Sequence, residues 1–181
     1  MTRSIAFLVT LGLALAAVSA SGQQLTAGPI KLFLNEVQPG GLSTSQYCTL
    51  VFADHHFHSE KADIKKGQDN SRKIYEGQLS DNDWNSMVAI IDSKEFTGMK
   101  VPRTVPPLIM QDTHPYNIAV LRGTDYQNME FLDKKSLKPY DPQIKPLLQW
   151  WKSLRGEHTP ESSAPANPQC ALDSNHAVYA Q

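Results

Sequence analysis

The sequence has little of what usually identifies a function. Of its 181 residues only two are cysteines, and 17 basic side chains almost balance 18 acidic ones. Charges that are balanced and well mixed create no field to attract nucleic acid, so we expect no nucleic-acid partner. The sequence also lacks H-E-x-x-H, the metalloprotease motif that fixes metal ligands and a base together, and G-x-S-x-G, the motif that presents a nucleophilic serine. Sequence motifs therefore assign no catalytic residue.

The longest uncharged run near the N-terminus is too short to be a membrane span. It extends from Ile5 to Val18, follows a cationic start at Arg3, and leads into small residues up to Ala20. A membrane helix needs about 20 apolar residues, whereas a shorter run before a small-residue site is typical of a cleaved signal peptide. We predict a signal peptide over 1–20, export to the periplasm or the exterior, and no membrane span after cleavage.

The other end of the chain has few large apolar residues. Residues 156–168 include three prolines among polar and small side chains. Such a segment cannot bury enough surface to offset its ordering entropy, so we predict a disordered Pro/Ser-rich tail over 156–181. Between the two ends we expect a flexible N-terminus over 21–27 and a single domain over 28–155.

The two cysteines, Cys48 and Cys170, both belong to the mature part of the chain. In an oxidising compartment they could form a disulfide. The bond would close a loop of about 120 residues and contribute roughly 4–5 kcal/mol in the chain-entropy model. The alternative is a buried thiol at Cys48 and a lone Cys170 in the tail, and the sequence leaves both possibilities open.

One helix has clear start signals. Ser80 is a favourable N-cap, and Asp83 follows three residues later as the acidic partner of a capping box. Apolar residues then recur on one helical face, at Trp84, Met87, Val88 and Ile91. We expect a second helix to begin at Pro146, after a tight turn over 141–144.

Strand patterns surround these helices. Alternating, β-branched or aromatic residues predict strands over 30–34, 47–57, 73–78, 115–121 and 126–132. The segment 122–125, which contains Gly123, favours a hairpin connection between the last two strands. The predicted order is β-β-β-α-β-β-α, which indicates an α+β fold with an antiparallel sheet and two helices on one face.

A resemblance rests on one strand and the helix after it. The residues Ile74-Tyr75-Glu76-Gly77-Gln78-Leu79-Ser80, followed by the helix through Asp83 and Ile91 and then Phe96, resemble small exported bacterial domains of unknown function. The resemblance covers about residues 46–154. It implies a fold, because its motif consists of folding signals, and it carries over no catalytic residue.

A histidine cluster is the candidate for chemistry. On a strand, Asp54, His56 and His58 would share one face, and two imidazoles at i and i+2 can bind one metal ion. His114 precedes a strand of the same predicted sheet and could supply a third ligand. Asp54 or Asp112 would then orient an imidazole or serve as a base. This interpretation predicts zinc or another divalent ion as cofactor, with hydrolysis as the candidate reaction.

The competing interpretation needs no ion. An antiparallel strand with one solvated face requires polar side chains at alternate positions, and these histidines meet that requirement. Our leading hypothesis is therefore an exported, non-catalytic binding or envelope-associated protein without a cofactor, whose partner is a protein or envelope component that the sequence does not name. The divalent-metal site is the alternative.

Overall fold

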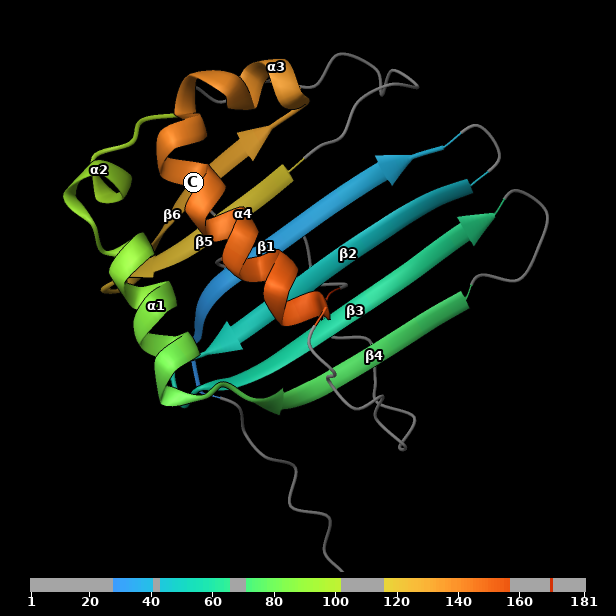
Figure 1. The fold of residues 1–181 in the computed structure, drawn as a ribbon, viewed down its shortest axis with the longest axis horizontal. Helices are drawn as coiled ribbons and strands as arrows, with labels where there is room; N and C mark the ends of the chain where they lie inside the picture. The colour runs from blue at the N-terminus through green and yellow to red at the C-terminus, as the bar shows by residue number, and fades with distance from the viewer. Residues whose placement is uncertain (1–27, 41–42, 66–70, 102–115, 157–169, 171–181) are drawn as a thin grey trace, which may run out of the picture.

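The protein forms an α+β domain built on one antiparallel sheet. The computed structural model describes residues 28–40, 43–65, 71–101, 116–156 and 170. Six strands pair in the order β4-β3-β2-β1-β5-β6, and every neighbouring pair is antiparallel (Figure 1). Their bounds are β1 Ile30–Pro39, β2 Ser43–Phe52, β3 His56–Lys65, β4 Ser71–Gln78, β5 Tyr116–Arg122 and β6 Asp125–Phe131.

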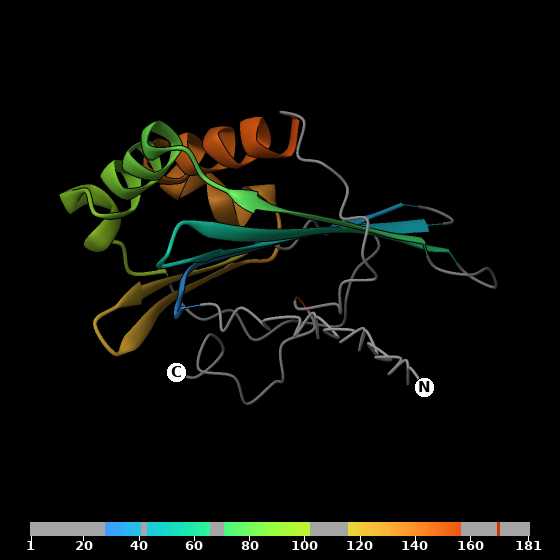
Figure 2. The same ribbon diagram turned by 90° about the horizontal axis from the view of Figure 1, so that it is seen from below.

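The helices lie together on one side of this sheet (Figure 2). They are α1 Asp81–Ile91, α2 Lys94–Thr97, α3 Lys134–Leu137, the short 3-10 helix η1 Lys138–Tyr140, and α4 Asp141–Gly156. The α+β class with an antiparallel sheet is confirmed, but the predicted order β-β-β-α-β-β-α is wrong. Four strands precede the first helix, and short helices that the sequence analysis missed flank the two long ones.

The strand predicted over 47–57 is in fact two strands joined by a tight turn. β2 ends at Phe52 and β3 begins at His56, so Asp54 and His55 lie in the turn rather than on a strand. His55 adopts a positive φ of 69°. The Asp54 side chain accepts a hydrogen bond from the backbone N–H of His56 at 3.1 Å. This local bond supports the reversal, in the way an aspartate commonly stabilises a turn.

The first long helix agrees with its sequence signals, and the second begins earlier than predicted. Ser80 caps α1 and accepts a hydrogen bond from the backbone N–H of Asp83. α4 begins at Asp141, not at Pro146, and it contains Pro146 in its interior. Pro146 costs the helix one backbone hydrogen bond. The complete burial of Ile144 and Leu147, on either side of it, offsets that loss.

The two faces of the sheet bury different sets of residues. The helix-covered face holds the larger core, with apolar residues from the strands packed under α1 and α4. The opposite face holds a smaller cluster made of Ile30, Phe33, Cys48, Leu50, Phe52 and Ala119. Within the described ranges, no helix has the length and apolar character that a membrane crossing requires. The predicted signal peptide over 1–20, the segment 21–27 and the tail beyond Gly156, apart from Cys170, lie outside the described residues.

Candidate functional site

Four charged or ionisable side chains meet on the sheet face that the helices do not cover. His58 and Glu60 lie two residues apart on β3, so they share a face, and Glu76 lies opposite His58 on β4. Arg72, also on β4, reaches across to Glu60. We call these residues, together with the disulfide described below, the Glu60 cluster. His58 has no exposed surface and Glu60 is 4% exposed, so β3 carries buried charge at this point.

Every hydrogen bond in the cluster pairs a positive or polar donor with a carboxylate. The His58 ring contacts Glu60 Oε1 through Nε2 at 2.9 Å and Glu76 Oε1 through Nδ1 at 3.0 Å. Arg72 donates to the second Glu60 oxygen. A neutral imidazole has a single N–H, so only the protonated form can donate to both carboxylates.

The protonation of His58 follows from a competition. Burial acts to lower the pKa of His58, but the hydrogen bonds and negative charges of Glu60 and Glu76 outweigh it and hold that pKa above its usual value. The charges of His58 and Arg72 then balance those of the two glutamates. Buried charges are stable in a protein when they are paired and hydrogen-bonded in this way.

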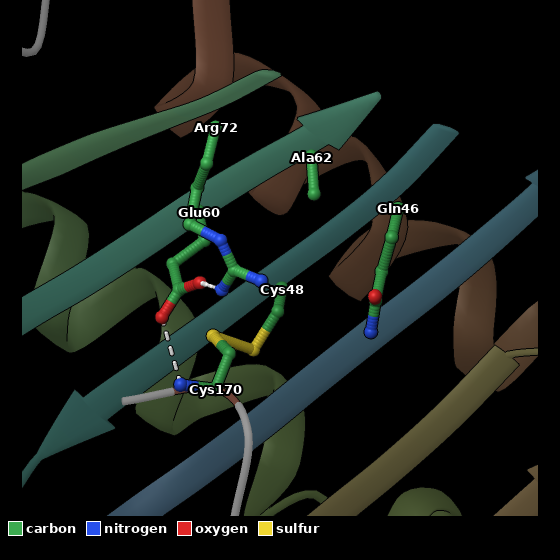
Figure 3. A pocket seen from close by; sticks show the side chains of 6 residues that line it. All are labelled: Gln46, Cys48, Glu60, Ala62, Arg72 and Cys170. Atoms are coloured by element: carbon green, nitrogen blue, oxygen red, sulfur yellow. Dashed lines mark hydrogen bonds and ion pairs between the residues drawn. A yellow bond between two sulfur atoms is a disulfide. The ribbon is translucent and has the colours of Figure 1, made fainter. Parts of the chain in front are cut away.

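A disulfide joins the C-terminal segment to this cluster. Cys48 on β2 is bonded to Cys170, and the Cys170 backbone N–H donates to Glu60 Oε1 at 2.8 Å. Of the two possibilities that the sequence left open, the structure contains the bond. A pocket of about 60 Å³ lies here, and Figure 3 shows the Arg72 side chain extending over it toward Glu60, with the disulfide beside them. It is lined by Gln46, Cys48, Glu60, Ala62, Arg72 and Cys170.

The predicted histidine site is only partly within the described residues. His56 and His58 lie at i and i+2 on β3. His58, however, already uses both ring nitrogens on carboxylates. Asp54 lies in the preceding turn, and His114 and Asp112 lie outside the described residues. The metal site of His56, His58 and His114, with Asp54 or Asp112 in support, therefore remains a prediction.

His55, the remaining histidine of the run, has a packing role. His55, in the β2–β3 turn, stacks on Trp84 of α1 with ring centroids 4.0 Å apart and planes 17° apart. The contact joins the turn to the helix-covered side of the sheet.

Sequence reasoning missed three members of the Glu60 cluster: Glu60, Arg72 and Glu76. A weak signal was present, because Glu60 continues the alternation of polar residues after His56 and His58 along β3. The register that sets Glu76 opposite His58 joins residues 18 positions apart, and Cys170 is 110 positions from Glu60. Neither pairing can be predicted from the local spacing of residues in the sequence.

A second hollow lies on the helix-covered face, beside the C-terminal end of α4. It has a volume of about 70 Å³, and we call it the Arg155 groove. It is lined by Tyr47, Cys48, Ser59, Glu60, Lys61, Tyr75, Leu154 and Arg155. The side chains of Cys48 and Glu60 point to the opposite face of the sheet. In Figure 1 the helices lie over one half of this face, and the far ends of β2, β3 and β4 extend beyond them.

Aromatic rings hold the cations of this groove. The Arg155 guanidinium lies 4.6 Å from the ring centroid of Tyr47 and 4.1 Å from that of Trp151. Lys61 Nζ lies 5.6 Å from the centroid of the Tyr47 ring. Cation–π contacts of this kind restrict where the positive charges sit.

A buried carboxylate pairs with Arg155 beside the groove. Glu36 is 4% exposed and accepts a hydrogen bond from Arg155 Nη1 at 3.0 Å and another from the Tyr116 hydroxyl at 2.8 Å. Burial acts to raise the pKa of Glu36, but hydrogen bonds from Gln38, Tyr116 and Arg155, with the Arg155 charge, outweigh it and hold that pKa below its usual value. The Glu36 carboxylate is therefore buried and paired with Arg155.

Comparison with known proteins assigns this chain to no family. No protein-family model matches the sequence, and no curated protein matches it significantly. The resemblance to small exported bacterial domains thus stays a resemblance of layout, and the functional argument rests on the geometry of this chain.

Proposed function

We propose that the protein is an exported, non-catalytic binding protein that holds an acidic polypeptide segment of an envelope partner in the Arg155 groove. The observation that carries this proposal is the arrangement of Lys61 and Arg155 beside Tyr47 and Tyr75 in this groove. Cations fixed by aromatic rings suit a ligand that offers carboxylates close to apolar surface.

The hydrogen-bonding capacity of Arg155 supports an anionic ligand. A guanidinium carries five N–H donors in a planar fork. Among the described residues, Arg155 donates one hydrogen bond, from Nη1 to Glu36. The remaining donors can bind a carboxylate, while Glu36 fixes the direction of the side chain.

Lys61 supplies the second positive charge. Its side chain is 38% exposed, and its Nζ lies 3.9 Å from Asp63 Oδ2, near the limit of an ion pair. Exposed ion pairs at such a distance contribute little to stability. Lys61 can therefore turn toward a ligand carboxylate at small cost.

The test is the affinity of the mature protein, residues 21–181, for a fluorescently labelled hexaglutamate peptide, measured by fluorescence anisotropy. We expect Lys61→Glu to weaken binding about ten-fold, or 1.4 kcal/mol, because it replaces an attraction by a repulsion. Lys134→Glu, in α3, makes the same charge change away from the groove and should leave the affinity unchanged.

Equal losses in the two variants would show that the peptide responds to net charge alone and would overturn the proposal. The same holds for a wild-type protein that does not bind hexaglutamate, or that binds hexalysine as well. Circular dichroism of each variant would verify that the fold is retained.

The second candidate is the divalent-metal site, with hydrolysis as its candidate chemistry. It is favoured by the placement of His56 and His58 two residues apart on β3. It predicts that the protein with its disulfide intact binds zinc in a one-to-one ratio and that His56→Ala abolishes the binding. Zinc binding that survives His56→Ala would exclude this ligand set.

A further inference from the structure

The Glu60 cluster brings together three atoms of the kinds that bind metal ions. A ring nitrogen of His58, a carboxylate oxygen of Glu60 and the sulfur of Cys170 lie within 4.8 Å of one another. The sulfur of Cys48 is bonded to that of Cys170 but is not one of these three mutually close atoms. In the structure both sulfurs are held in the disulfide, and a disulfide sulfur lacks the thiolate charge that binds a metal.

We propose that reduction of the Cys48–Cys170 disulfide converts this part of the cluster into a site for a divalent ion such as Zn²⁺. The ligands are His58 Nε2, one oxygen of Glu60, and the thiolates of Cys170 and Cys48. This donor set of one nitrogen, one oxygen and two sulfurs suits zinc, which accepts all three ligand types in a tetrahedron.

For His58, Glu60 and Cys170 the distances allow this conversion with small movements, whereas Cys48 Sγ would have to turn toward the ion. Zn–N and Zn–O bonds of about 2.0 Å and Zn–S bonds of about 2.3 Å place tetrahedral ligands about 3.3–3.8 Å apart. His58 Nε2 and Glu60 Oε1, now 2.9 Å apart, would separate slightly as the ion replaces the proton between them. The two sulfurs would move apart once their bond is broken.

Neighbouring residues would hold the ligands in place. The hydrogen bond from His58 Nδ1 to Glu76 orients the imidazole so that Nε2 faces the site. A carboxylate on the far ring nitrogen is the usual support of a metal-binding histidine. Arg72 holds the second oxygen of Glu60 in the same manner.

The chemistry balances with a thiol as the reductant. Two thiol molecules transfer two electrons to the disulfide, leave as their own disulfide, and yield the Cys48 and Cys170 thiols. When the ion binds, the two S–H protons and the His58 Nε2–H proton pass to solvent. The pocket of about 60 Å³ lies beside the disulfide, and Cys170 is half-buried there (Figure 3).

Cys48 and Glu60 also line the Arg155 groove, but their side chains point to the other face of the sheet, so the two proposals use different side chains and either can fail alone. The test is a Co²⁺ titration of the mature protein, because cobalt–thiolate bonds give a charge-transfer absorption band in the near ultraviolet. With the protein reduced by a phosphine, which offers no thiol to compete, we expect the band to saturate at one ion per chain. Zn²⁺ should then abolish it, and the oxidised protein should show no band.

Cys170→Ser provides a matched comparison, because it lacks the disulfide just as the reduced wild type does and differs from it by one sulfur atom. We expect it to bind Co²⁺ at least ten-fold more weakly, and Glu60→Gln to weaken binding as well. His56→Ala removes a neighbouring imidazole on the same strand and should leave the band unchanged.

Several results would overturn the proposal. One is a reduced wild type that is folded by circular dichroism but shows no thiolate band. Others are a Cys170→Ser protein with the same affinity, or loss of the band in His56→Ala, which would indicate a different ligand set.

Discussion

Removal of the Cys48–Cys170 disulfide should lower the free energy of unfolding by less than the number of residues between the two cysteines implies. In the unfolded state the bond closes a loop of about 120 residues, which the chain-entropy model values at about 5 kcal/mol. In the folded state the same bond also ties Cys170 to the sheet, about 15 residues after the end of α4 at Gly156, and closing a ring of that length costs about 3 kcal/mol in the same model. The expected net loss for Cys170→Ser is therefore about 2 kcal/mol.

Urea unfolding of the mature protein, followed by tryptophan fluorescence, measures this loss. All three tryptophans lie in α1 and α4 and report on the helix-covered core. Wild type reduced with a phosphine, in metal-free buffer, should match Cys170→Ser. Cys48→Ser should lose more, because Cys48 is 2% exposed and the new hydroxyl would be buried on β2.

Two outcomes would refute this reasoning. A loss near 5 kcal/mol or above in Cys170→Ser would mean that the bond stabilises the sheet itself rather than the attachment of the C-terminal segment. An unchanged midpoint would mean that the bond does not form in the mature protein, which mass spectrometry after thiol labelling would check.

Three further predictions concern the helix-covered face. Trp151→Phe removes the 2.7 Å hydrogen bond from the indole N–H to Thr49 Oγ1 and should lower the unfolding free energy by about 2 kcal/mol; a change below 0.5 kcal/mol would contradict it. Gly77→Ala should cost about 1–3 kcal/mol, because its Cβ would lie 2.8 Å from Phe57 Cε1, and Phe57→Leu in the same chain should recover part of that loss. Glu36 has a pKa below its ordinary 4.5, so the stability it contributes is present above pH 4.5 and is lost as the pH falls through its folded-state pKa. In Glu36→Gln the free energy of unfolding should therefore fall less steeply at acid pH than in wild type. Equal slopes in the two proteins would disprove the assignment.

Local signals in the sequence were sufficient for the elements whose ends depend on their own residues. α1 begins where Ser80 caps it, and the β5–β6 hairpin turns at Gly123, whose φ of 66° suits a glycine. The β2–β3 turn escaped prediction because His55 adopts a positive φ without a glycine or asparagine to signal it. The start of α4 was misplaced because burial of its apolar residues outweighs the loss at Pro146.

The candidate sites depended on contacts that no local pattern contains. The histidine run drew attention to the correct strand, and His58 does lie in a cluster of titratable groups. Its partners come from β4 and from Cys170, and the strand register that aligns them is a property of the whole sheet. The Arg155 groove likewise needs the end of α4 to meet β2 and β3, which is decided by how the helix packs.

Binding of an acidic segment in the Arg155 groove can be tested by locating a bound acidic peptide on the protein. Amide chemical shifts of the isotopically labelled mature protein, recorded by NMR as unlabelled hexaglutamate is added, would do so. We expect the largest shifts at Tyr47, Lys61, Tyr75 and Arg155, with those of β6 unchanged. Shifts spread over all exposed lysines, or confined to the opposite face of the sheet, would contradict it.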